Sequence, residues 1–225
     1  YQQQLPSVGA LDHSEPLPVA ELQQWLLDEL VNEFDYLLCL TVASQRSQIF
    51  EHATQASFCL LQHYRARRAE AGLSGPFAMR VIDSKSVFAG VAVLAAEGMR
   101  LIADGAHPNA VRVRLEQLAQ QTCTFIVADD LAHLRQRGFQ KGDRSGLLDK
   151  VRGAALGLGS LLDVKPVLSI QSGDDKPVAL APSFDKAAQK LFAHAVGRVE
   201  AAELVALGYL RDPAIGLVVL DEMTY

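Results

Sequence analysis

The sequence has 225 residues, of which 49% are hydrophobic and 21% are charged, and its mean hydropathy is +0.11. That size and composition predict a globular protein with a sizeable core, built as one large domain or as two smaller lobes. The formal net charge of -5 argues against general attraction to nucleic acid or to an anionic membrane surface. The longest apolar runs are also too short to span a bilayer. We therefore expect no nucleic-acid partner and no stable membrane insertion.

The cysteines and histidines follow no pattern typical of a metal site or a disulfide framework. Cys39, Cys59 and Cys123 are an odd number without metal-ligand spacing, and the six histidines are scattered. No signal-peptide pattern opens the sequence, and no glycine motif has dinucleotide or nucleoside-triphosphate spacing. These observations predict reduced cysteines, a cytoplasmic location, and neither a metal nor a cofactor.

Hydrophobic patterning in the first half predicts helices that alternate with strands. Apolar residues at helical spacing indicate a helix over residues 19–33, and the continuous apolar run over 36–43 indicates a strand buried on both faces. A helix over 49–69, a strand over 77–83 and a helix over 87–103 follow. This order predicts an α/β fold whose first lobe holds a parallel sheet with right-handed crossovers.

The second half of the sequence is richer in glycine and predicts a different kind of sheet. The turn signal Ser172-Gly173-Asp174-Asp175 lies between two apolar runs, which is typical of a β-hairpin. We therefore expect two lobes, with the parallel sheet in residues 1–120 and a mixed or antiparallel sheet in residues 121–225. The other expected elements are a helix at 109–119, a strand at 123–130, a loop at 135–146, a helix at 150–164, a hairpin at 165–181, a helix at 183–206 and a strand at 214–220.

Two polar clusters follow the two strands of the first lobe. Ser44 and Ser47 lie in "TVASQRSQIF", and an Asp-Ser-Lys-Ser cluster occupies residues 83–86 in "VIDSKSVF". The carboxyl ends of parallel strands share one edge of a sheet, so these hydroxyls and the helix-start amides could together receive a carboxylate or phosphate. The alternative is purely structural, with Ser47 and Ser86 as helix caps and Asp83 as a turn acceptor.

Several ordered segments resemble one known family. The segments "VIDSKSVFAG", "VADDLAHLRQRG" and "GLGSLLDVKPVLSIQSGD" are similar, in that order, to segments of the DegV family of bacterial fatty-acid-binding proteins. "HSEPLP" and "VASQRSQIFEHA" likewise resemble the family's "TSQPSP" and "ISSKLSGTYQSA". The resemblance begins near Asp12 and implies two α/β lobes that hold a long-chain fatty acid, with its tail in an apolar tunnel between them. It also implies a binding protein without catalysis of its own, which presents the acid to a separate fatty acid kinase subunit.

The same resemblance implies a set of residues around the carboxylate of the bound acid. Ser47 matches the serine of "LSGT" that holds this carboxylate, and Ser44 lines the same pocket. His13 stands where the family has the threonine of "TSQPS", and Ser14 keeps its place in that loop. Tyr209 falls where the family has the histidine of its late "AHTGPGA" motif. We therefore predict that these five residues bind the ligand.

The sequence also departs from the family pattern. "SGTYQ" is replaced by residues 47–51, "SQIFE", and a family arginine that docks the kinase aligns near Asp185. These departures bear on the kinase partner more than on acyl binding. An acyl tail of about 15 methylenes contributes on the order of 12 kcal/mol when buried, whereas one charged hydrogen bond adds about 1.5–3 kcal/mol.

Two alternatives from other functional classes stay open at this point. One is a hydrolase or acyltransferase in which His13 acts as general base on Ser47 or Ser14. The other is a degenerate structural or regulatory module that has lost its ligand, with side chains filling the tunnel.

Overall fold

The computed structural model describes residues 15–127 and 164–206. Of the predicted elements, the loop at 135–146, the helix at 150–164 and the strand at 214–220 lie outside the described residues, apart from residue 164. Within the described ranges, no helix is long and apolar enough to cross a membrane.

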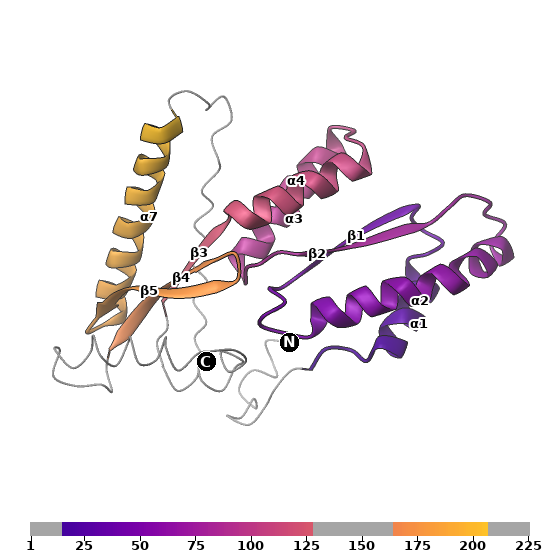
Figure 1. Cartoon of the computed structure of the whole chain (residues 1–225), viewed down its shortest axis with the longest axis horizontal. Helices are drawn as coiled ribbons and strands as arrows, with labels where there is room; N and C mark the ends of the chain where they lie inside the picture. The colour runs from indigo at the N-terminus through magenta and orange to yellow at the C-terminus, as the bar shows by residue number, and fades with distance from the viewer. Residues whose placement is uncertain (1–14, 128–163, 207–225) are drawn as a thin grey trace.

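The first sheet is parallel and lies between two pairs of helices (Figure 1). Strand β1 (Tyr36–Thr41) pairs with β2 (Ala78–Asp83) from Tyr36↔Ala78 to Thr41↔Asp83. Helices α1 and α2 pack on one face, and α3 and α4 pack on the other. Their bounds are Val19–Glu29, Ile49–Glu70, Ala89–Ala103 and Pro108–Gln121. This arrangement confirms the predicted lobe with a parallel sheet in three layers.

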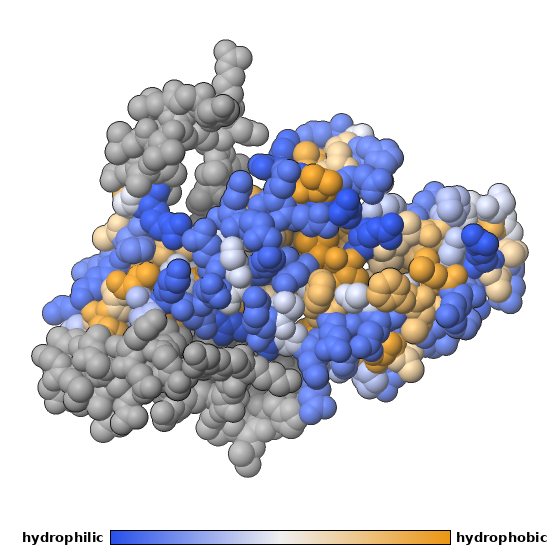
Figure 2. Space-filling view, viewed as in Figure 1, coloured by the Kyte–Doolittle hydropathy of each residue, from blue (hydrophilic) through white to orange (hydrophobic). Residues whose placement is uncertain are grey.

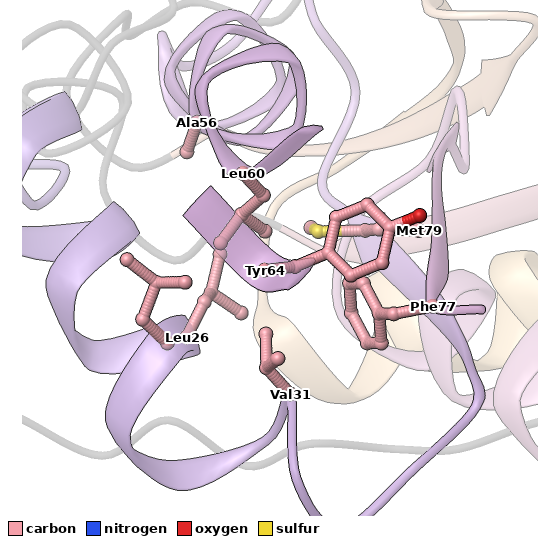
Figure 3. Packing of buried hydrophobic residues seen from close by; sticks show 8 residues of the cluster. Leu26, Val31, Ala56, Leu60, Tyr64, Phe77 and Met79 are labelled. Carbon is pink, nitrogen blue, oxygen red and sulfur yellow. The ribbon is translucent and has the colours of Figure 1, made fainter. Parts of the chain in front are cut away.

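Strand β1 contributes to a separate hydrophobic cluster on each face of the sheet. Leu37 and Cys39 pack toward α1 and α2, while Leu38 and Leu40 pack toward α3 and α4. Alternate residues of a strand point to opposite faces, so a strand covered on both sides needs a continuous apolar run. Figure 3 shows the packing of the first cluster. Its labelled members are Leu26, Val31, Ala56, Leu60, Tyr64, Phe77 and Met79.

A buried arginine fixes the turn between α1 and β1. Arg68 on α2 is 4% exposed and donates to the carbonyl oxygens of Val31 and Phe34 at 2.8 and 3.0 Å. Its Nη2 also pairs with Asp35 Oδ1 at 2.5 Å. These bonds give the guanidinium several partners inside the fold, which buried charges require.

The second sheet is antiparallel, in the order β3-β4-β5, and α7 (Phe184–Ala206) covers it. Strands β4 (Lys165–Gln171) and β5 (Asp174–Ala181) form the predicted hairpin. Its turn residues Ser172 and Gly173 have φ values of 53° and 84°. Positive φ at both central positions is the requirement of a type I′ turn. Strand β3 (Cys123–Val127) pairs with β4 from Cys123↔Gln171 to Val127↔Val167.

The predicted bounds of several elements differ from the structure at their ends, as for the first strand, which ends at Thr41 instead of residue 43. Helix α1 ends at Glu29 instead of residue 33, and α3 begins at Ala89 instead of residue 87. The later start of α3 has a local cause, because Phe88 has a φ of 45° and a ψ of -119°, which is not helical. The predicted boundary between the lobes, after residue 120, stays a prediction.

The outer face of α3 and α4 carries a small charge network centred on Glu97. Arg100 donates to both carboxylate oxygens of Glu97 at 2.8 and 3.1 Å, and Arg114 on α4 donates at 3.3 Å. These bonds, that from Arg100 first, lower the pKa of Glu97 below its ordinary value of 4.5. The pairing therefore stabilises the fold above about pH 4.5 and is lost as the pH falls through the lowered pKa.

We expect Glu97→Gln to lower the free energy of unfolding by about 0.5–1 kcal/mol at pH 7, as is usual for partly exposed ion pairs. The difference from the wild type should shrink as the pH falls through the lowered pKa of Glu97, because the wild-type carboxyl then becomes protonated. Urea unfolding at pH 7 and at a pH below that pKa measures the difference. An equal difference at both pH values would mean that packing, not charge, explains the effect.

Candidate functional site

The two predicted polar clusters lie together at one edge of the parallel sheet. Since Thr41 and Asp83 are register partners, β1 and β2 end side by side. The segments that follow, residues 42–48 and 84–88, are called the strand-end loops below. Loop 42–48 leads into α2, and loop 84–88 leads into α3. This edge is where ligands bind in open parallel sheets.

Asp83 joins the two strand-end loops. Its Oδ2 accepts a hydrogen bond from the Ser44 hydroxyl at 2.6 Å, and its Oδ1 accepts from the backbone amides of Ser44 and Lys85 at 3.1 and 2.9 Å. The interpretation of Asp83 as a turn acceptor is thus confirmed. The Ser44 hydroxyl donates its hydrogen to Asp83, so it could only accept a hydrogen bond from a ligand. Its predicted contact with a carboxylate stays a prediction, and its observed contact holds the loops together.

Ser47 is differently placed, at the start of α2. Its half-buried hydroxyl accepts a long hydrogen bond, 3.3 Å, from the Ile49 amide, which opens the helix. Among the described residues, no acceptor engages the hydroxyl hydrogen of Ser47. The acidic side chain in the first turn, Glu51, accepts from Gln55 at 3.2 Å, one turn further along the helix. The start of this helix therefore combines a hydroxyl donor with the partial positive charge of the helix dipole, which favours an anion.

The segment "VIDSKSVFAG" connects the parallel sheet with the antiparallel sheet. The hydroxyls of Ser86 and Thr124, the second on β3, form a hydrogen bond of 2.6 Å, and both side chains are buried. The Ser84 hydroxyl donates to the Ser86 carbonyl oxygen at 3.1 Å and accepts from the Ser86 amide. The prediction that Ser86 caps α3 was wrong, because its hydroxyl is bonded to Thr124 and the helix starts three residues later.

Gly90 makes this junction sterically possible. A Cβ atom at this position would overlap Ser86 Oγ and Thr124 Oγ1. The first turn of α3 can therefore approach the serine and threonine pair only if residue 90 has no side chain. The glycine, the two hydroxyls and the carboxylate of the motif thus have structural roles in the same small region.

Apolar side chains are exposed on the segments around the start of α2. Leu17, Ile49 and Phe88 have exposed fractions of 53%, 39% and 49%. His52, in the first turns of α2, donates from Nδ1 to the Leu17 carbonyl oxygen at 2.7 Å, which brings residue 17 beside the helix. Phe88 holds a positive φ that is costly for a bulky residue. Exposed apolar side chains therefore accompany the hydroxyl of Ser47 at this end of the sheet.

The structure brings two of the five predicted ligand residues into one loop, Ser44 and Ser47. His13, Ser14 and Tyr209 lie outside the described residues, so their placement stays a prediction. Two features were missed from the sequence, the pairing of Ser44 with Asp83 and the exposure of Phe88. The sequence around Ser44 does not reveal its hydrogen bond with Asp83, because 39 residues separate the two. For the exposure of Phe88, the sequence offered one signal, a phenylalanine shortly after the polar residues 83–86.

Cys39, Cys59 and Cys123 are free thiols in the structure. Burial raises the pKa of the Cys39 thiol, which disfavours the reactive thiolate.

Comparison with known proteins settles the family. A model described as "Uncharacterised protein, DegV family" matches residues 1–213. The chain belongs to the DegV family. A DegV domain-containing protein of Xanthomonas campestris pv. campestris is 44% identical over 198 residues, which are 86% of this chain and 61% of the relative. A second, from Xanthomonas axonopodis pv. citri, is 44% identical over 82% of this chain and 57% of the relative. The chain thus spans about three fifths of these relatives' length.

Solved structures of fatty-acid-binding proteins share the fold at low sequence identity. A stearic acid-binding protein from Eubacterium ventriosum is 19% identical with a TM-score of 0.64, over 92% of this chain and 60% of that one. A DegV family protein from Thermus thermophilus, described by its fatty acid binding, is 20% identical with a TM-score of 0.61, over 92% of this chain and 72% of that one. The predicted two-lobed DegV fold is therefore confirmed.

Proposed function

We propose that this DegV protein binds a long-chain fatty acid without covalent chemistry. In this proposal the carboxylate lies at the start of α2 and accepts the hydroxyl hydrogen of Ser47. The observation that carries it is the Ser47 hydroxyl, whose hydrogen has no acceptor among the described residues, beside the first amide of a 22-residue helix. The two solved structures compared above, described as binding stearic acid and fatty acid, support the same class of ligand.

The surroundings of Ser47 suit a carboxylate held by neutral donors. The hydroxyl and the helix dipole favour the anion, and Asp83 is already satisfied by Ser44 and Lys85. A carboxylate whose lone pairs accept three hydrogen bonds repels a second anion less than a bare one does. The bound carboxylate would therefore approach from the side of Ser47 and the helix start, away from Asp83.

The acyl tail is assigned to apolar surface that continues from this edge. Ile49 and Phe88 supply exposed apolar contacts beside the strand-end loops. In Figure 2, hydrophobic residues also reach the surface between the two pairs of helices, over the region where Figure 1 draws β1 and β2. Tail burial at about 0.8 kcal/mol per methylene supplies most of the affinity, and an apolar tunnel between the lobes would provide it.

Two finer parts of the proposal concern catalysis and partners. We infer that the protein has no catalytic activity of its own and needs no cofactor besides the bound acid. Its described serine hydroxyls near the site are bonded to Asp83, to Thr124 or to backbone, and none is bonded to an imidazole. We further infer that a kinase subunit receives the bound acid in the cytoplasm, as the family resemblance implies.

Native mass spectrometry of the full chain tests the proposed function. We expect a copurifying acyl chain, or the uptake of one equivalent of oleate or palmitate by delipidated protein. The absence of both would contradict the proposal. Treatment with an active-site phosphonate distinguishes a hydrolase from a binding protein. Covalent labelling of Ser47 would favour an enzyme, and an unlabelled protein would favour binding without catalysis.

A further inference from the structure

The turn of the β4–β5 hairpin lies against both strand-end loops. The Gly173 amide donates to the Lys85 carbonyl oxygen at 2.9 Å, which joins the turn to loop 84–88. On the other side, a Cβ atom at Gly173 would overlap the Gln45 side chain in loop 42–48. The antiparallel sheet is thus in contact with both strand-end loops, including loop 42–48, which carries Ser44 and Ser47.

An ion pair strengthens this contact next to Ser47. Arg46 on loop 42–48 pairs with Asp175, the second residue of β5, and their side chains are 10% and 12% exposed. Charges removed from water to this extent interact strongly with each other, and loss of one removes that compensation from the other. In the family segment "ISSKLSGTYQSA", leucine stands at the position of Arg46. The charge pair is therefore a feature of this sequence and not of that motif.

We propose that Arg46 and Asp175 are positioning residues for the fatty-acid site. Arg46 is the residue immediately before Ser47, so its fixed side chain restrains the backbone that presents the Ser47 hydroxyl. Asp175 supplies that restraint from the antiparallel sheet. Affinity for the acid thereby depends on a residue in the other sheet. This inference rests on the proposed fatty-acid binding and adds the coupling between the two sheets.

Coupling of this kind is reciprocal. If the pair holds the Ser47 loop in the form that binds the acid, bound acid must also stabilise the contact between the hairpin and the loop. Amides of residues 44–48 and 172–175 should therefore exchange more slowly with solvent when palmitate is bound. A merely structural ion pair would not link exchange in the hairpin to the ligand.

Displacement of a fluorescent fatty-acid analogue by palmitate measures the effect on affinity. We expect Asp175→Asn and Arg46→Leu each to weaken palmitate binding about 5-fold or more. The double variant should bind no more weakly than either single variant, because the two changes remove one shared interaction. Asp175→Glu keeps the charge and should recover much of the affinity. Glu116→Gln is the matched control, since it breaks the Arg112–Glu116 pair on α4 and should leave the affinity unchanged.

Three outcomes would overturn the inference. The first is wild-type palmitate affinity in both single variants, even if their stability falls. The second is a double variant whose loss of affinity equals the sum of the two single losses. The third is a loss of affinity in Asp175→Glu as large as that in Asp175→Asn. Failure of the proposed function is distinguishable, because the wild type would then take up no acid. In that case, hydrogen exchange of the backbone amides in the ligand-free protein tests whether Arg46 and Asp175 restrain the Ser47 loop. Faster exchange of residues 44–48 in Asp175→Asn supports it, and unchanged exchange refutes it.

Discussion

Replacement of Gly90 by alanine is expected to lower the free energy of unfolding by about 2–6 kcal/mol. The added methyl group would overlap Ser86 Oγ and Thr124 Oγ1, which are buried and hydrogen-bonded to each other at 2.6 Å. Overpacking of a buried site costs about 1–3 kcal/mol. Separation of the two hydroxyls adds about 1–3 kcal/mol if either is left buried without a partner. Urea unfolding followed by circular dichroism measures the sum.

Gly197 provides the matched control for this experiment. It lies in α7, it is exposed, and a Cβ atom there would meet nothing within 4 Å. Alanine is preferred over glycine in helices, so Gly197→Ala should raise stability by about 0.5–1 kcal/mol. If Gly90→Ala left stability unchanged or raised it, as expected for Gly197→Ala, the close approach of α3 to the serine and threonine pair would be refuted.

Replacement of Ser47 by alanine is expected to weaken palmitate binding about 10-fold to 100-fold. The change removes one hydrogen bond to a charged group, which is worth about 1.5–3 kcal/mol, and leaves the acyl tail contacts intact. Binding should therefore become weaker without being abolished. Isothermal titration of delipidated protein with palmitate measures the affinity.

Ser183→Ala is the control for the structural part of this change. Ser183 stands before α7, where its hydroxyl accepts from the Lys186 amide at 3.4 Å, much as Ser47 accepts from Ile49. Both variants lose a weak hydrogen bond at a helix start, but only one loses the proposed contact with the carboxylate. Equal palmitate affinity in the Ser47 variant and the wild type would remove Ser47 from the site.

Much of the fold could be predicted because its signals are local. The run "YLLCLT" is apolar at every position but the last, and it forms a strand with a hydrophobic cluster on each face. Helix α2 begins at the predicted Ile49, and the Ser172-Gly173 turn forms the predicted hairpin. In each case, the period of the apolar residues or the turn chemistry alone selects the structure.

The cap prediction for Ser86 failed because a distant residue competes for the same hydroxyl. Serine before an apolar helical pattern is typical of an N-cap. Here Thr124, 38 residues away, forms the hydrogen bond instead, and α3 starts without a side-chain cap. A tertiary partner thus overrides a sound local preference, and one sequence does not reveal that partner.

The candidate site was only partly predictable for the same physical reason. The position of both polar loops at one sheet edge follows from parallel pairing, and the structure confirms it. The use of each side chain depends on contacts across the fold, such as Ser44 with Asp83 and Arg46 with Asp175. These contacts distinguish the Ser44 hydroxyl, which binds another loop, from the Ser47 hydroxyl, whose hydrogen has no acceptor among the described residues.

The carbon NMR signal of palmitate labelled with 13C at its carboxyl group tests the central claim most directly. With delipidated full-length protein, we predict a separate bound carboxyl signal that saturates at one equivalent. Its chemical shift should change in Ser47→Ala and stay the same in Ser183→Ala. Absence of a bound signal would contradict fatty-acid binding, and a bound signal that is identical in Ser47→Ala would place the carboxylate elsewhere.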